Sequence, residues 1–167
     1  GAERLVMASL QNGSGLSVLR EVEGAYELIG TVADSPTTHL TAISALTHAE
    51  IGGAQYVFAA SATEHGVAAM RLTAEGTLNP VDALGAGGWL PIARPTDLDV
   101  VEVAGSSYLI VAAQGTGSLT SLRIEADGVL TPVDHIVDDL ATRFGGATAM
   151  DWIVVDGQAF GAVAGAD

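Results

Sequence analysis

The hydrophobic residues of this chain fall into short runs that are separated by turns containing glycine. A nearly continuous apolar run covers residues 108–113, and alternate positions at Leu122 and Ile124 then lead to Asp127-Gly128. Runs of this length, rich in Val, Ile and Tyr, are typical of strands rather than helices. Because glycine accepts a positive φ without steric cost, Asp127-Gly128 is expected to close a tight hairpin. The same pattern predicts hairpins at Glu23-Gly24, Glu75-Gly76 and Asp156-Gly157.

The pattern occurs twice at a fixed spacing. Residues 54–82 (AQYVFAASATEHGVAAMRLTAEGTLNPVD) align without a gap on residues 106–134 (SSYLIVAAQGTGSLTSLRIEADGVLTPVD), at an offset of 52 positions. Fainter copies flank them, because residues 15–34 match the second half of the unit and residues 150–167 match its beginning. Self-similarity at a fixed period of this size indicates a repeat architecture. The chain therefore holds two whole units and two partial ones.

Each whole unit is predicted to form four antiparallel strands. The second strand, at residues 56–60 in one unit and 108–113 in the next, is the most apolar, as expected of a strand covered on both faces by neighbouring sheets. The fourth strand, Thr131–Asp139, is acidic, which suits an outer edge that charge protects from pairing with other edges. A four-stranded unit with a buried inner half and a polar rim is typical of a β-propeller blade. The prediction is an all-β fold of β-propeller blades.

One known family carries a similar unit. The stretch YLIVAAQGTGSLTSLRIEADGVLTPV (residues 108–133) resembles the blade signature of the lactonase-type propellers, the group that includes bacterial 6-phosphogluconolactonase and the YVTN-like propellers. The resemblance covers both whole units and, more faintly, the two partial ones. It implies a propeller, which in that family closes as a ring of seven blades. It implies little about chemistry, because folds of this kind host many unrelated functions.

The repeat also sets the expected domain organisation. We expect a single partial β-propeller domain over residues 1–167, with blade remnants at 1–38, blades at 39–90 and 91–141, and a partial blade at 142–167. This is about three and a quarter blades, whereas closed rings begin at about four. Each blade buries its faces only against its neighbours, so an open arc leaves two apolar faces in water.

Two interpretations of the open arc remain. The chain is a piece of a longer protein, or several chains assemble into one ring. In the second case the last strands of one chain pair with the opening segments RLVMASL and GLSVLRE of the next. Self-association or the remainder of a longer chain is therefore expected to close the ring, and a stable lone monomer is not expected.

Composition excludes several classes of partner. The chain has 20 acidic residues against 6 basic ones, all of them arginine, and its net charge is −14. Nucleic acid and anionic lipid would be repelled, so neither is expected as a partner. The absence of cysteine removes disulfides and thiolate zinc sites, and no apolar run reaches the length of a membrane span. We expect no cofactor, and a bacterial periplasmic or extracellular setting fits best.

Candidate binding residues come from positions that break the repeat. Arg71 and Arg123 recur in the same strand, so we expect them to brace one blade against the next. The connections between units differ (ADSPTTHLTAIS, GAGGWLPIARPTDLD and VDDLATRFGGATAMD), and such connections line the mouth of a propeller's central channel. Arginine there can hold a small anionic ligand through paired hydrogen bonds, and tryptophan can stack on a ring. The candidate ligand-binding residues are His39, Trp89, Arg94, Asp97, Asp99, Arg143 and Asp151.

The sequence offers no catalytic motif to set beside these residues. It lacks a Gly-x-Ser-x-Gly elbow, a His-Glu-x-x-His pair and a phosphate-binding Gly-x-x-x-x-Gly-Lys loop. In the resembled lactonases the start of a blade often carries a Pro-Arg-His-like element. Here Pro95, Thr96 and Asp97 stand in its place, so no catalytic residue carries over. Strand alternation would send the side chains of DHIVDD (residues 134–139) to two faces, which favours a solvated acidic edge over a cation site.

Two functional hypotheses follow. The leading one is a non-catalytic β-propeller binding module that belongs to a larger bacterial protein. The alternative is a lactonase-like hydrolase acting on a sugar-acid lactone, which the resemblance alone carries. Lactone hydrolysis would need a polarised carbonyl and a water activated by a base or a metal.

Overall fold

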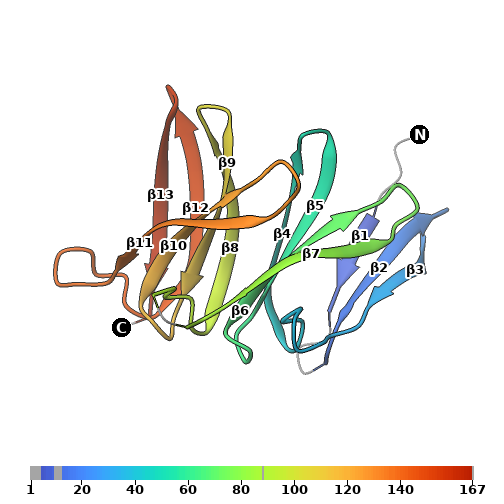
Figure 1. Cartoon of the computed structure of the whole chain (residues 1–167), viewed down its shortest axis with the longest axis horizontal. Helices are drawn as coiled ribbons and strands as arrows, with labels where there is room; N and C mark the ends of the chain where they lie inside the picture. Colours follow the sequence, from blue (N-terminus) through green and yellow to red (C-terminus); the bar gives the residue numbers. More distant parts are fainter. Residues whose placement is uncertain (1–4, 10–12, 88, 167) are drawn as a thin grey trace.

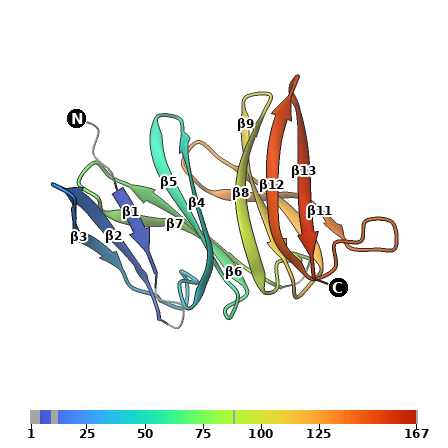
Figure 2. The same ribbon diagram turned by 180° about the vertical axis from the view of Figure 1, so that it is seen from behind.

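The computed structural model describes residues 5–9, 13–87 and 89–166, and every regular element in them is a strand. Four antiparallel sheets stand side by side along an arc (Figures 1 and 2). The first blade contains β1 (Leu5–Ala8), β2 (Leu16–Val22) and β3 (Ala25–Val32). The second contains β4 (Ile43–Ile51), β5 (Ala54–Ser61), β6 (Gly66–Leu72) and β7 (Leu78–Gly85). The third contains β8 (Pro95–Val103), β9 (Ser106–Ala113), β10 (Ser118–Ile124) and β11 (Leu130–Val137), and the fourth contains β12 (Ala147–Val155) and β13 (Gln158–Gly165).

The predicted all-β fold with four-stranded units is confirmed. Sheet order follows chain order in both whole blades, β4-β5-β6-β7 and β8-β9-β10-β11. The predicted blade bounds fall in the connections between sheets. The predicted fourth strand is shorter than expected, because β11 ends at Val137 and leaves Asp138 and Asp139 in a connection. Within the described residues there is no helix of the length and apolar character needed to cross a membrane.

Strand register shows which part of a blade each terminal sheet supplies. Leu5 of β1 pairs with Arg20 of β2, just as Tyr56 of β5 pairs with Arg71 of β6. β1 and β2 are therefore equivalent to the second and third strands of a whole blade, and the first blade has strands two to four of the unit. The β12–β13 pair has the same register shift near its start as β4–β5 and β8–β9, so the fourth blade has strands one and two. The two terminal sheets therefore hold complementary parts of a blade, with the second strand present in both.

The apolar cores lie between the sheets. On β5, Phe58 and Ala60 face the core shared with the third blade, whereas Val57 and Ala59 face the core shared with the first. All four side chains are at most 1% exposed. Strand alternation thus divides one apolar run between two interfaces, which explains why residues 57–60 contain no polar side chain. A smaller core around Phe144 joins the third blade to the fourth.

Hydroxyl groups connect neighbouring blades at the start of each first strand. Ser44 Oγ donates to the carbonyl of Pro95 in the next blade at 2.7 Å, and Thr96 Oγ1 donates to that of Ala147 at 2.6 Å. These two residues are 52 positions apart, and each also reaches a carbonyl of its own second strand. A hydrogen bond of this kind stabilises the fold by about 1 kcal/mol and fixes the position of one blade on the next.

A tyrosine of one blade packs on a hairpin glycine of the next. Tyr56 is 2% exposed, and its ring lies so close to Gly128 that a Cβ on this glycine would be 2.3 Å from Cε1. Gly128 also has the positive φ that the sequence predicted, at 88°. Glycine is therefore required here both by the backbone and by the neighbouring blade.

Substituting Gly128 tests this contact. We expect Gly128→Ala to lower the free energy of unfolding by about 2 to 4 kcal/mol, because the overpacking cost adds to that of a left-handed alanine. Gly53→Ala is the matched control, since Gly53 has a φ of 80° and no atom within 4 Å of an added Cβ. In the control, the free energy of unfolding should fall only by the cost of a left-handed alanine. Urea denaturation of both variants measures the difference. Equal losses would contradict the packing role of Tyr56.

Candidate functional site

The connections between blades gather at one end of the molecule, which we call the loop end. It carries the β3–β4 and β7–β8 connections together with the β5–β6 and β9–β10 turns, toward the lower edge of Figures 1 and 2. The β11–β12 connection projects sideways, to the left in Figure 1, before it reaches the start of β12 at the same end. The sequence predicted the three connections as the candidate site. It did not predict that the turns after the second strands would lie at the same end.

The three connections share a framework despite their different sequences. Each contains a buried apolar residue followed two positions later by a residue with positive φ. The buried residues are Leu40, Ile92 and Phe144, and the residues with positive φ are Ala42, Arg94 and Gly146. Each set repeats at intervals of 52 positions. This framework fixes the connections against the sheets and presents the intervening side chains at the loop end.

Aspartates hold two of these connections in place. Asp34 Oδ1 accepts the N–H of Leu40 at 2.8 Å, and Asp138 Oδ1 accepts the N–H of Phe144 at 2.6 Å. Burial of Asp34 raises its pKa, but hydrogen bonds from Leu40 N–H and the Thr41 hydroxyl outweigh this and lower it overall. Asp138 is therefore a cap of a connection and not a member of a strand face, which corrects the alternation expected for residues 134–139.

Arg94 occupies the left-handed position of the β7–β8 connection. Its φ is 53°, a conformation that costs a non-glycine residue about 1 to 2 kcal/mol, whereas the equivalent residues are alanine and glycine. The side chain is exposed, and its guanidinium makes no hydrogen bond or ion pair with any described residue. An unpaired arginine on a strained backbone is a candidate ligand-binding group.

His65 lies directly beside Arg94 and was missed by the sequence analysis. Its Nδ1 accepts the backbone N–H of Arg94 at 3.0 Å, which links the β5–β6 turn to the next blade. Because Nδ1 is the acceptor, the neutral ring carries its proton on Nε2, so Nε2–H is a donor available to a ligand. His65 also has a positive φ of 55° where the third blade has Gly117. This departure from the repeat was the signal that could have identified it.

His39 and Glu64 complete the neighbourhood of His65. The His39 ring lies over two glycines, since an added Cβ on Gly66 would be 2.5 Å from its Cγ and one on Gly85 would be 3.3 Å from its Nε2. Glu64 Oε2 accepts the N–H of Thr41 at 2.7 Å. The β3–β4 connection is thus attached to the β5–β6 turn, and the predicted candidate His39 is brought to the same end as Arg94.

The other predicted connection residues, Trp89 and Arg143, make no hydrogen bond or ion pair with Arg94 or His65. Trp89 is 68% exposed, and its ring is available at the loop end. Arg143 is exposed and its Nε donates to the carbonyl of Leu140 within its own connection at 3.1 Å. Arg123, expected to brace two blades, instead pairs with Glu125 of its own blade, with 2.6 Å between Nη2 and Oε1.

The three aspartate candidates lie in strands and not in connections. Asp97 and Asp99 are on β8 and Asp151 is on β12, because both strands begin earlier than the apolar pattern indicated. Asp97 Oδ2 accepts the N–H of Met150 in the next blade at 2.7 Å. Burial raises the pKa of Asp99, backbone hydrogen bonds oppose this, and the nearby carboxylates of Asp151 and Asp97 raise it further. Asp97 thus joins the inner strands of two blades.

The described residues contain no group of three or more histidine, aspartate or glutamate side chains placed to hold a metal ion. At the loop end, exposed Arg94 and His65 Nε2–H are hydrogen-bond donors, and Trp89 offers an exposed ring. Together they supply cationic and neutral hydrogen-bond donors and one apolar ring surface.

Comparison with known proteins supports the architecture. No protein-family model and no curated protein sequence matches the chain. A crystal structure of a protein from Lactobacillus plantarum matches with a TM-score of 0.68 and 16% identity, covering 98% of this chain and 45% of that one. The periplasmic gluconolactonase of Pseudomonas aeruginosa matches with a TM-score of 0.61 and 16% identity, covering 80% of this chain and 36% of that one.

A third similar structure is a glycoside hydrolase. The exo-β-1,3-galactanase of Phanerochaete chrysosporium matches with a TM-score of 0.64 and 12% identity, covering 100% of this chain and 42% of that one. The chain has the β-propeller fold. It spans less than half the length of each of these three proteins. At these identities the likeness describes the fold alone.

The raised pKa of Asp99 predicts a pH-dependent variant. A folded-state pKa above the unfolded one means that protonated Asp99 contributes stability below the unfolded pKa, and that this contribution is lost as pH rises through the folded pKa. We therefore expect Asp99→Asn to stabilise the chain at pH 7, with a gain that shrinks as the pH falls toward about 4. Urea denaturation at both pH values measures it. Glu102→Gln, at an exposed position of β8, is the control. A gain that does not change with pH would contradict the assignment.

Proposed function

We propose that the loop end binds a small anionic carbohydrate, such as a sugar acid, and that the chain is a non-catalytic section of a larger propeller protein. The observation that carries this proposal is the unpaired, exposed guanidinium of Arg94 beside the Nε2–H of His65. Both residues have left-handed backbones where other copies of the unit have glycine or alanine. A strained backbone that presents two donors on one surface is typical of a binding site.

The overall charge makes this surface distinctive. The net charge of −14 repels anions from most of the molecule, so a local pair of donors is needed to hold one. The planar guanidinium can form two parallel hydrogen bonds to a carboxylate or phosphate. Exposed Trp89, on the same β7–β8 connection as Arg94, offers a ring on which the apolar face of a sugar can pack.

Lactone hydrolysis is the second candidate. It is favoured by the resemblance to lactonase-type propellers and by the structural likeness to a gluconolactonase. The tautomer of His65 argues against its use as a base, because Nδ1 is occupied by the N–H of Arg94 and Nε2 carries the proton. His65 can donate a hydrogen bond to a lactone carbonyl, whereas the nearby carboxylate of Glu64 already accepts the N–H of Thr41 through Oε2. Binding without hydrolysis is therefore the function that we propose.

Replacement of Arg94 tests the binding site. We expect Arg94→Gly to weaken gluconate or 6-phosphogluconate binding at least about tenfold, because the variant loses at least one charge-assisted hydrogen bond to the ligand. The free energy of unfolding should stay within about 1 kcal/mol of the parent, because relief of the left-handed strain offsets the entropy of glycine. Isothermal titration calorimetry measures the first and urea denaturation the second. Arg71→Ala, which removes the same charge from an exposed position on β6, should leave binding unchanged.

A hydrolysis assay separates the two candidate functions. We expect the parent chain to bind gluconate but to leave the rate of gluconolactone hydrolysis at its spontaneous value. The measurement is pH-stat titration with and without protein. Acceleration that disappears in Arg94→Gly would overturn the non-catalytic proposal and support the lactonase. Absence of gluconate and 6-phosphogluconate binding in the parent would contradict the ligand class.

A further inference from the structure

Two of the three connections between blades are held by a carboxylate near their start. Asp34 and Asp138 each accept the N–H of the buried apolar residue six positions further along the chain. The equivalent residue of the β7–β8 connection, 52 positions from both, is Ala86, whose side chain has no acceptor. The N–H of the buried residue in that connection, Ile92, donates instead to the carbonyl of Leu90 at 3.0 Å. The connection that carries the candidate site therefore lacks the carboxylate that holds the other two.

A histidine of the preceding turn holds this connection instead. The carbonyl of His65 accepts the N–H of Ala86 at 2.6 Å, and its Nδ1 accepts the N–H of Arg94 at 3.0 Å. These two residues are the first and the last of the connection, because β7 ends at Gly85 and β8 begins at Pro95. One residue of the β5–β6 turn thus binds both ends of the connection. Its side chain is exposed, so the imidazole exchanges protons freely with solvent.

The same contact uses a backbone group in the preceding unit. The equivalent of His65 ahead of the β3–β4 connection is Gly13. Its carbonyl accepts the N–H of Ala42, which stands where the β7–β8 connection has Arg94, at 2.8 Å. A backbone carbonyl remains an acceptor at every pH, and a carboxylate remains one down to about pH 4. Of the three connections, only β7–β8 is therefore hydrogen-bonded, within the described residues, to a side chain that changes its charge near neutral pH.

We propose that His65 is a pH-sensitive switch that controls how the β7–β8 connection is attached to the second blade. The neutral imidazole accepts the N–H of Arg94 at Nδ1, whereas the imidazolium carries a proton on both ring nitrogens and has no acceptor. Protonation therefore turns this hydrogen bond into a contact between two N–H groups, and the ring and the backbone of Arg94 separate. Histidine ordinarily changes its charge between about pH 5 and 8, so the switch opens as the pH falls through that range.

Other ionisable side chains lie on the elements around His65. The β7–β8 connection supplies a guanidinium, the β3–β4 connection a carboxylate and a second imidazole, and the turn itself a carboxylate, which are those of Arg94, Asp34, His39 and Glu64. The β9–β10 turn has none, and Asp97 near the start of β8 accepts the N–H of Met150 in the fourth blade. Both carboxylates of the first group accept hydrogen bonds from Thr41. The second imidazole titrates in the same pH range, so the test has to separate the two histidines.

The other side of the connection stays attached when the switch opens. The carbonyl of Pro91 accepts three hydroxyl groups of the third blade, those of Thr116, Ser118 and Thr120. The carbonyl of Arg94 accepts the N–H of Gln114 in the same blade at 3.0 Å. Protonation of His65 therefore separates the Arg94 end of the connection from the second blade alone. The change is local, and the core between the two blades is kept.

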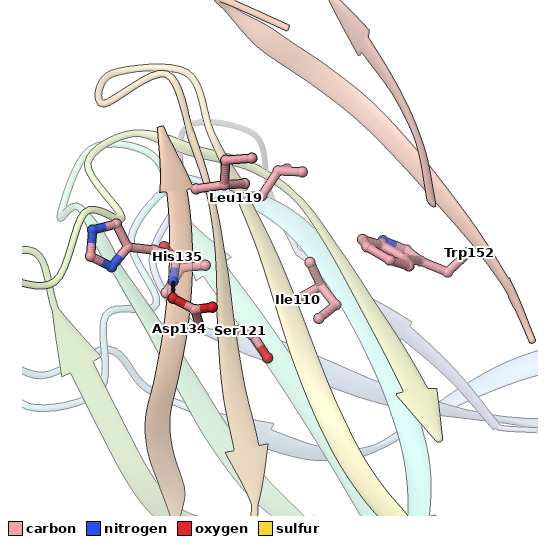
Figure 3. A pocket seen from close by; sticks show the side chains of 8 residues that line it. Ile110, Leu119, Ser121, Asp134, His135 and Trp152 are labelled. Atoms are coloured by element: carbon pink, nitrogen blue, oxygen red, sulfur yellow. Dashed lines mark hydrogen bonds between the residues drawn. The ribbon is translucent and has the colours of Figure 1, made fainter. Parts of the chain in front are cut away.

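His135 on β11 provides a control histidine that is attached to no connection. Figure 3 shows its ring pointing away from Ile110 and Trp152, which face each other across the groove beside the fourth blade. Its backbone N–H donates to Asp134 Oδ1 at 2.8 Å, and the ring itself makes no hydrogen bond within the described part of the chain. Like His65, it is exposed. Replacing it removes an imidazole of similar exposure and leaves the loop end unchanged.

Exchange of backbone amides with water, followed by NMR on the free chain at about pH 7.5 and about pH 5.5, tests the switch. Protection of the Arg94 amide, relative to an unstructured peptide at the same pH, should fall about fivefold at the lower pH through the loss of one exposed hydrogen bond. The amides of Leu40 and Phe144, which carboxylates hold, should keep their protection within about twofold. Because no ligand is present, the result is independent of the proposed sugar-acid binding. Unchanged protection of Arg94, or an equal fall at all three amides, would overturn the switch.

Asparagine variants assign the effect to one histidine. His65→Asn keeps a residue that tolerates positive φ and supplies a side-chain oxygen that accepts without titrating. Protection of the Arg94 amide in this variant should therefore be the same at both pH values and within about twofold of the parent at the higher one. In His39→Asn and His135→Asn the fall should be as large as in the parent. A fall that persists in His65→Asn, or that disappears in His39→Asn, would assign the proton to another group and contradict the proposal.

Discussion

No sheet in this chain has a hydrophobic core of its own, and this constraint governs the rest of the structure. Each sheet buries apolar side chains only against the next sheet, so stability depends on how accurately the blades are placed. The alternation of Val57 and Phe58 on β5 divides one strand between two such cores. The hydroxyls of Ser44 and Thr96 then fix the inner strands, and Asp82 fixes the outer ones.

The same dependence explains how strained residues persist at the loop end. Arg94 and His65 belong to different blades, yet one hydrogen bond joins them. The cost of their left-handed backbones is of the order of 1 to 2 kcal/mol each. The core between the second and third blades includes Phe58, Leu109 and Ile92, all fully buried. The anchor Ile92 is two residues from Arg94, so this core stabilises the conformation that presents the guanidinium.

The sequence predicted the blades well because their signal is periodic. Apolar runs, hairpin glycines and the offset of 52 positions depend on local chemistry that repeats, and the structure has the strands that they indicated. The site was harder to predict, because its parts come from different blades. His65 was not predicted, because it lies in the β5–β6 turn and not in a connection between blades. Asp97 was assigned to a connection, although it lies on β8 and accepts a hydrogen bond from β12. A histidine replacing a turn glycine was visible in the sequence, whereas its contact with Arg94 was not.

The position of the candidate site separates its function from the closure of the ring. Arg94, His65 and Trp89 lie between the second and third blades, whose mutual core is the most extensive in the chain. Their geometry is therefore set within one copy. The first and fourth blades instead carry large exposed apolar side chains on their strands, such as Leu28 and Ile153. The interior blades form the surface that a ligand meets, and the terminal blades provide the contacts for whatever completes the ring. A change at Arg94 should thus alter ligand binding without altering the contacts that complete the ring, because the two depend on different interfaces.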